Sequence, residues 1–207
     1  MKFVNGYCFP DHDIDCSKVI IGQSGDIQKV LNYVKGFNVC LQAGGNVGIW
    51  PKILSGFFKS VYTFEPDLEN FNCLLANLHG IKNVYPKHGA LSDKTENVIV
   101  KSPNKAHDNN CGAYQIFEDP NGLKTTRIDD LNLTVDLIYL DIEGYELKAL
   151  QGAVETIEKS HPVICFEDKQ LPIMYGKKVG DVEKWLEGFG YEVKERVHRD
   201  VICVSSL

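Results

Sequence analysis

Four acidic residues stand at or just beyond points where an apolar, strand-like run ends: Glu65, Asp141, Glu143 and Glu167. Another apolar run leads into a glycine-rich segment, Gln42-Ala43-Gly44-Gly45-Asn46-Val47-Gly48. Glycines let the backbone approach a ligand closely, and a carboxylate at a strand tip accepts hydrogen bonds from a ribose diol. The glycine turn and Glu65 therefore predict a nucleoside site, and the other acids are placed to do chemistry beside it.

The glycine spacing indicates which nucleoside. The dinucleotide fingerprint G-x-G-x-x-G holds a diphosphate at a helix N-terminus, whereas this chain has Gly44-x-Asn46-x-Gly48. The tighter turn suits a ligand without a diphosphate, such as S-adenosylmethionine (SAM), and disfavours a nicotinamide oxidoreductase. A short glycine motif is weak evidence alone, so a turn that simply needs glycines stays the alternative.

Strand-like and helix-like segments alternate, which predicts a mostly parallel sheet covered by helices on both faces. Apolar spacing predicts helices at 26–35, 47–58, 67–78, 146–159 and 179–188. Strands are expected at 38–42, 61–64, 83–88, 135–140, 163–166, 191–197 and 201–205. Only His198-Arg199-Asp200 separates the last two strands, which is a hairpin spacing, so at least one closing strand is antiparallel. The expected α/β fold is the Rossmann-like, seven-stranded sheet of a class I SAM methyltransferase with an antiparallel C-terminal hairpin.

Two segments lie outside this alternation. The N-terminal extension and helix, 1–35, reads as irregular and acidic up to about Ser24. The segment 95–127 holds short strand-like pieces at 97–101, 113–117 and 124–127 around a polar loop, and is expected to be a small β insertion resembling a lid. The whole chain, 1–207, is expected to form one domain.

Composition limits the class of protein. The chain has 207 residues, 43% of them hydrophobic and 24% charged, as in ordinary globular proteins. No apolar stretch approaches a membrane span, and the start has no signal-peptide pattern. A net charge of −6 disfavours nucleic-acid partners, whose binding rests on Lys and Arg. The seven cysteines include no C-x-x-C pair, which favours neither a zinc site nor disulfides, and a cytoplasmic location is expected.

Several of these segments, in order, resemble the FkbM family of SAM-dependent methyltransferases. They are Gln42 to Gly48, Phe64-Glu65-Pro66, Asn77, Ala90-Leu91-Ser92-Asp93, Asp141-Ile142-Glu143-Gly144-Tyr145-Glu146, Leu150-Gln151-Gly152-Ala153 and Glu167. The resemblance covers roughly residues 38–168, and Gln42 and Gly45 stand where the family usually has an acid and an alanine. It implies SAM as the cofactor and O-methylation of a sugar or another small hydroxyl compound.

The expected site follows from these motifs. The adenine is expected against Gly89, Ala90 and Leu91, where small residues leave room for a flat ring. A general base assists transfer to a hydroxyl, and the candidate catalytic residues are Asp141, Glu143, Glu167 and, from the insertion, His107 and Asp108. The candidate cofactor-binding residues are Gln42, Ala43, Gly44, Asn46, Gly48, Glu65, Pro66, Gly89, Ala90, Leu91 and Asp141.

Other interpretations stay open. A ribose 2′-O or other nucleic-acid methyltransferase is one, and a SAM-binding protein without catalysis, suggested by Gln42, is another. The acidic run Asp11-His12-Asp13-Ile14-Asp15 could suggest a metal, but a solvated loop is favoured because no second ligand cluster supports it. No metal site is expected.

Overall fold

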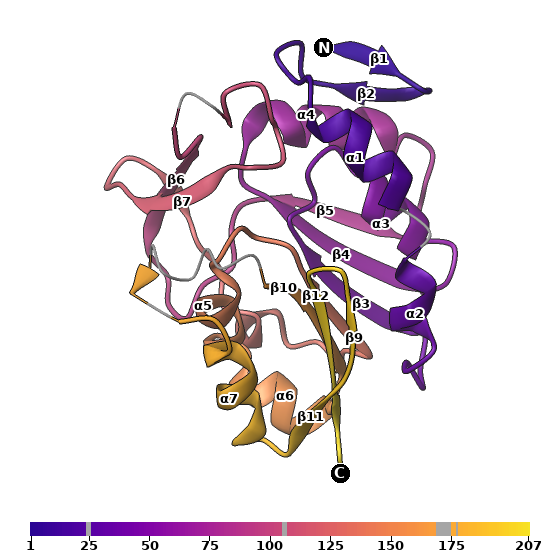
Figure 1. Ribbon diagram of the computed structural model, residues 1–207, viewed down its shortest axis with the longest axis vertical. Helices are drawn as coiled ribbons and strands as arrows, with labels where there is room; N and C mark the ends of the chain where they lie inside the picture. Colours follow the sequence, from indigo (N-terminus) through magenta and orange to yellow (C-terminus); the bar gives the residue numbers. More distant parts are fainter. Residues whose placement is uncertain (24–25, 105–106, 169–174, 177) are drawn as a thin grey trace.

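A seven-stranded sheet is the centre of the computed structural model (Figure 1), which describes residues 1–23, 26–104, 107–168, 175–176 and 178–207. The sheet has the order β11-β12-β10-β9-β3-β4-β5. Its strands are β3 (Val39–Ala43), β4 (Ser60–Glu65), β5 (Val84–His88), β9 (Leu137–Leu140), β10 (Val163–Glu167), β11 (Tyr191–Val197) and β12 (Asp200–Ser205).

The strand directions confirm the expected class. Strand β3 pairs in parallel with β4 and β9, β4 pairs in parallel with β5, and β9 pairs in parallel with β10. Strand β12 is antiparallel to both of its neighbours, β10 and β11. This is the mostly parallel sheet of class I methyltransferases with its antiparallel C-terminal hairpin.

Helices cover both faces of the sheet, and Figure 1 shows α1, α3 and α4 on one side and α5, α6 and α7 on the other. Successive strand residues point to opposite faces: Cys40 and Leu137 pack with the first group of helices, Leu41 and Ile138 with the second. The helices are α1 (Cys16–Gln23), α2 (Ile27–Leu31), α3 (Ile49–Leu54), α4 (Leu68–Asn77), α5 (Glu146–Gln151), α6 (Val154–Ser160) and α7 (Asp181–Glu187). Cys40, Cys165 and Cys203 are buried, as core residues should be.

Two sequence expectations about helices are wrong. The helix expected at 146–159 is two helices interrupted at Gly152 and Ala153. Gly152 packs so closely on the backbone of Ser92 that a Cβ would lie 2.1 Å from its carbonyl oxygen. The N-terminal segment is not irregular: it forms a hairpin, β1 (Lys2–Val4) with β2 (Tyr7–Phe9), and then α1. Asp13, expected in a solvated loop, is fully buried.

The insertion forms its own three-stranded antiparallel sheet with the order β7-β6-β8. Its strands are β6 (Asn97–Lys101), β7 (Gln115–Glu118) and β8 (Leu123–Lys124). A bridge between Leu91 and Thr126 connects it to the segment that follows β5. The insertion therefore stands beside the edge of the main sheet where the parallel strands end.

Among the described residues, no helix has both the length and the apolar character needed to cross a membrane.

Candidate active site

A cavity of about 740 Å³ opens at the carboxyl ends of the parallel strands. Ala43 at the end of β3, Glu65 at the end of β4, Asp141 after β9 and Glu167 at the end of β10 all line it. Its volume lies within the usual range for small-molecule and cofactor sites, about 300–1,000 Å³. Ligands of such sheets bind at this edge, so the cavity is the candidate site.

The glycine turn packs directly against the neighbouring strand. Gly44 has a φ of 81°, and a Cβ on it would lie 1.8 Å from the backbone oxygen of Asp141. Only glycine fits such a contact, and its φ also favours glycine. Gly48 has a φ of 89° and stands at the start of α3 without lining the cavity. The turn thereby holds the ends of β3 and β9 together under the ligand space.

Glu65 is held in place by the same turn. One carboxylate oxygen accepts the backbone N–H of Asn46 at 2.6 Å, and the other accepts that of Asp67 at 2.8 Å. The side chain is 6% exposed yet lines the cavity. Burial raises the pKa of Glu65 to about 8, and its two backbone hydrogen bonds oppose that rise. The two backbone N–H groups thus hold the Glu65 side chain in a fixed orientation at the cavity wall.

Gln42 uses its amide inside the turn. Its Nε2 donates to the carbonyl oxygens of Ala43 and Gly44 at 3.1 and 2.8 Å, and its Oε1 accepts from the hydroxyl of Thr63. Gln42 is fully buried and does not line the cavity. In this arrangement it shapes the turn, and its contact with a cofactor stays a prediction.

The residues expected around the adenine lie together. Gly89, Ala90 and Leu91 line the cavity, as does Pro66. Val100 and Ile116 of the insertion join them there. Small and apolar side chains of this kind are compatible with an adenine ring, and the Glu65 carboxyl lines the same cavity. The residues and the volume of the cavity therefore fit the nucleoside part of SAM.

Three carboxylates converge beyond β9 and β10. Asp141, Glu143 and Glu167 all line the cavity, and each offers an oxygen within 4.8 Å of the others. Such a group could bind a divalent cation, a cationic group of a ligand or a hydroxyl. Glu143 is 7% exposed and has a φ of 56°, so the backbone bends sharply to present it.

Glu146 shapes that bend. Its Oε1 accepts the backbone N–H groups of Ile142 and Gly144 at 3.0 and 3.2 Å. It is 1% exposed, and burial raises its pKa to about 8. The sequence indicated an ordinary residue of a first helical turn. The turn-forming Gly144, two residues earlier, was a signal that the Glu146 carboxyl could bond to the backbone of a turn. Through those bonds it fixes the segment that carries Asp141 and Glu143.

The insertion supplies a wall of the cavity next to Glu65. The carbonyl oxygen of Cys111 accepts from the side-chain amides of Asn46 at 3.1 Å and Asn70 at 2.7 Å. His107 lines the cavity, and Asp108 does not. The loop around Cys111 is therefore hydrogen-bonded to the glycine turn, through Asn46, and to α4, through Asn70.

Sequence reasoning missed a second group of lining residues. Trp50 and Tyr139, whose ring centres are 5.7 Å apart, form one wall, and the Tyr139 hydroxyl donates to Asp200 at 3.2 Å. His198 and Arg199 of the β11–β12 turn also line the cavity. The sequence predicted only a hairpin there, and the pairing of Asp200 with Glu167 places its turn at the carboxyl end of β10.

The sequence is similar to a known protein family. The model of the methyltransferase FkbM domain matches residues 42–193, well over half of the chain. No curated protein matches the sequence.

Solved structures share the fold at low identity. A methyltransferase FkbM from Methylobacillus flagellatus KT superposes with a TM-score of 0.53 at 18% identity, over 80% of this chain and 42% of that one. A ribosomal protein L11 methylase from Lactobacillus delbrueckii subsp. bulgaricus gives 0.56 at 14% identity, over 98% and 83%. An rRNA methylase from Streptococcus thermophilus gives 0.52 at 10% identity, over 87% and 94%. The chain spans about two fifths of the first of these structures, and at such identities the likeness shows the fold alone.

Proposed function

We propose that this chain, which belongs to the FkbM family of SAM-dependent methyltransferases, transfers the methyl group of SAM to a hydroxyl of a small acceptor such as a sugar. The family makes the chain a methyltransferase and SAM its cofactor. The hydroxyl acceptor is the step beyond the family. The observation that supports it is the convergence of Asp141, Glu143 and Glu167 in the same cavity as Glu65.

SAM supplies a methyl group on a sulfonium, which a nucleophile displaces in line. Alignment of the nucleophile is then the protein's main task. Glu65 is placed to hold the ribose, and the wall around Ala90 to hold the adenine. The backbone N–H of Asp141 donates to the carbonyl oxygen of Ala43 at 3.1 Å, so Asp141 stands next to the glycine turn. Asp141 is therefore assigned to the amino group of the methionyl part.

Glu143 and Glu167 are assigned to the acceptor. A hydroxyl is a weak nucleophile, and a carboxylate within hydrogen-bond reach takes its proton as the bond to carbon forms. Glu143 is the stronger candidate for this base because it is 7% exposed and its loop is fixed by Glu146. Glu167 is then placed to orient the acceptor.

Transfer of labelled methyl from SAM to a panel of sugars, other small alcohols, amines and RNA oligonucleotides tests the proposal. With the acceptor that reacts, we expect Glu143→Gln to lower kcat by about 10²–10⁴, the usual range for loss of a general base. The matched control is Glu158→Gln, an exposed carboxylate of α6, which should keep full activity. Full activity of both Asp141→Asn and Glu143→Gln would contradict the assignment, and so would exclusive reaction with amines.

A nucleic-acid acceptor is the alternative that this panel also decides. Asp26 and Asp200 add to the acidic lining, and the net charge is −6. Nucleic-acid affinity depends on neutralising phosphates with Lys and Arg, so this cavity favours a small neutral or cationic acceptor. Transfer to RNA but to none of the small acceptors would overturn the proposal.

A further inference from the structure

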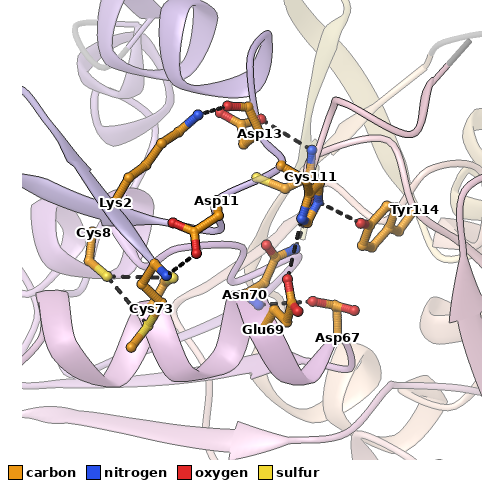
Figure 2. Close-up of polar contacts among 12 residues, drawn as sticks. Lys2, Cys8, Asp11, Asp13, Asp67, Glu69, Asn70, Cys73, Cys111 and Tyr114 are labelled. Atoms are coloured by element: carbon orange, nitrogen blue, oxygen red, sulfur yellow. Dashed lines mark hydrogen bonds and ion pairs between the residues drawn. The ribbon is translucent and has the colours of Figure 1, made fainter.

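A second cluster of ligand-type side chains lies where α1 meets the insertion. Asp13, Cys16 and Cys111 are all buried, and each offers one ligand atom within 4.8 Å of the others. Figure 2 shows Asp13 and Cys111 facing each other across this junction. The two cysteines are 95 residues apart in the chain (111 − 16), so no local motif in the sequence reveals the cluster.

The backbone fixes the cluster from both sides. One carboxylate oxygen of Asp13 accepts the N–H groups of Cys16 at 3.1 Å and Cys111 at 3.2 Å, and the other accepts that of Ser17 at 3.0 Å. The N–H of Ile14 donates to the carbonyl oxygen of Asn109 at 2.7 Å. The side chains of Ser17 and Cys111 also hydrogen-bond to this carboxylate, so Asp13 is held in place between α1 and the insertion.

The side-chain oxygen of Asn46, which accepts the backbone N–H of Val47 at 2.7 Å, lies beside the cluster. This oxygen, Oδ1, lies 3.7 Å from the sulfur of Cys16 and 3.9 Å from that of Cys111. Tetrahedral zinc has Zn–S bonds of about 2.3 Å and Zn–O bonds of about 2.0–2.2 Å, which places neighbouring ligand atoms about 3.3–3.8 Å apart. The two separations from Asn46 are close to these values, and those among Asp13, Cys16 and Cys111, which are up to 4.8 Å, would have to shorten by up to about 1.0–1.5 Å around an ion.

We propose that Asp13, Cys16 and Cys111 bind one soft divalent cation, Zn²⁺ above all, with the amide oxygen of Asn46 or a water molecule as the fourth ligand. Two thiolates favour zinc over magnesium or calcium, which prefer oxygen ligands. Binding releases the two thiol protons. The inference concerns a site other than the carboxylates of the transfer site and does not rest on the hydroxyl acceptor.

Such an ion would connect the loop around Cys111, a part of the insertion that lines the cavity, to α1. Cys16, Asn46 and Cys111 all line the cavity, and Asn46 also donates its backbone N–H to Glu65. A metal bonded to both cysteines holds the loop around Cys111 against the turn that presents Glu65. We therefore expect the ion to tighten cofactor binding without taking part in methyl transfer.

Zinc titration of the reduced full-length protein, in competition with a chromophoric chelator, tests the site. We expect one equivalent to bind, and Co²⁺ in its place to give thiolate-to-cobalt charge-transfer absorption and the visible bands of a tetrahedral site. Cys16→Ser and Cys111→Ser should each weaken Zn²⁺ binding at least 100-fold and abolish the charge-transfer band or shift it. Melting temperatures measured with EDTA establish that each variant is folded.

The matched control is Cys73→Ser. The sulfur of Cys73 lies 3.6 Å from that of Cys8, a second close pair of thiols that is visible in Figure 2. That pair forms no such three-ligand group within the part of the chain that the structure describes. Cys73→Ser should bind Zn²⁺ as the parent protein does. The proposal is overturned if the reduced protein binds no zinc, if Cys16→Ser and Cys111→Ser bind normally, or if Cys73→Ser abolishes binding.

Discussion

At the scale of single residues, Glu65 shows how one side chain is prepared for its ligand. Burial favours its neutral form, whereas the backbone N–H groups of Asn46 and Asp67 favour the carboxylate. Burial is the larger influence, and the pKa of about 8 reflects this. In the proposed complex, ribose hydroxyls that donate to Glu65 also favour the carboxylate. Cofactor binding should therefore release a proton from this group.

This predicts a pH-dependent affinity for S-adenosylhomocysteine, the demethylated cofactor. Below pH 8 the protonated carboxyl must ionise as the ligand binds, so affinity should rise with pH by up to tenfold per unit and level off above about 8. Calorimetry at pH 7 in buffers of different ionisation enthalpy counts the protons released. Glu65→Gln should weaken binding at pH 8.5 by about 1.5–3 kcal/mol and release fewer protons. Equal proton release by both proteins would contradict this account of Glu65.

At the scale of elements, the glycine turn joins two strands through a contact that no side chain permits. Gly44 and Gly80 have nearly the same positive φ, 81° and 84°. A Cβ on Gly44 would meet Asp141 at 1.8 Å, whereas a Cβ on Gly80 would meet nothing within 4 Å. An alanine at position 80 therefore tests the free-energy cost of the positive φ alone. An alanine at position 44 adds the cost of the steric clash with Asp141.

We expect Gly80→Ala to lower the free energy of unfolding by about 1–2 kcal/mol, the cost of a left-handed conformation. Gly44→Ala should cost several kcal/mol more or prevent folding, because β3 and β9 must move apart. Urea unfolding of both variants measures the difference. Similar losses would show that the turn relaxes easily and does not fix the strand ends.

The loop around Cys111 in the insertion is a second element, and its attachment to α4 can be tested. Asn70 of α4 is 2% exposed and donates to the carbonyl oxygen of Cys111 at 2.7 Å. Asn70→Ala should make trypsin cleavage between Lys101 and Arg127 faster and weaken S-adenosylhomocysteine binding several-fold. Asn72→Ala, at an exposed position of the same helix, is the control and should change neither. Unchanged proteolysis of Asn70→Ala would show that this bond does not hold the loop.

At the scale of the whole molecule, buried carboxyls make stability depend on pH. Glu146 has an ordinary pKa of 4.5 that burial raises to about 8 in the folded protein. The folded state therefore binds more protons than the unfolded state between these values, and stability must fall as pH rises through this window. In Glu146→Gln both hydrogen bonds of Oε1 can persist without a buried charge.

Thermal unfolding from pH 5 to pH 9 should therefore show a steeper loss for the parent protein than for Glu146→Gln. The difference in unfolding free energy should grow in favour of the variant to a few kcal/mol near pH 9, at up to about 1.4 kcal/mol per unit. Parallel curves for the two proteins would show that Glu146 does not take up a proton on folding.

The sequence predicted the sheet and most of the acids at its carboxyl edge, because alternation and strand-end acids are local signals. Glu65, Asp141, Glu143 and Glu167 line one cavity as their positions after strands indicated. The side chain of Gln42 instead bonds within its own turn, since Thr63 on the adjacent strand takes its oxygen. Burial of Asp13 depends on the N–H of Cys111, a contact across 98 residues that no local pattern carries.

The placement of β12 between β10 and β11 also has a consequence for synthesis on the ribosome. Strand β10 pairs with β9 on one side and with β12 on the other, and β12 is built from residues 200–205. Until these residues emerge, the nascent chain exposes one edge of β10, and β11 lacks β12, its neighbour in the sheet. Open edges invite pairing with other chains. Translation that stops before Asp200 should thus yield aggregating chains, even though residues 42–193, which match the family model, would all have been made.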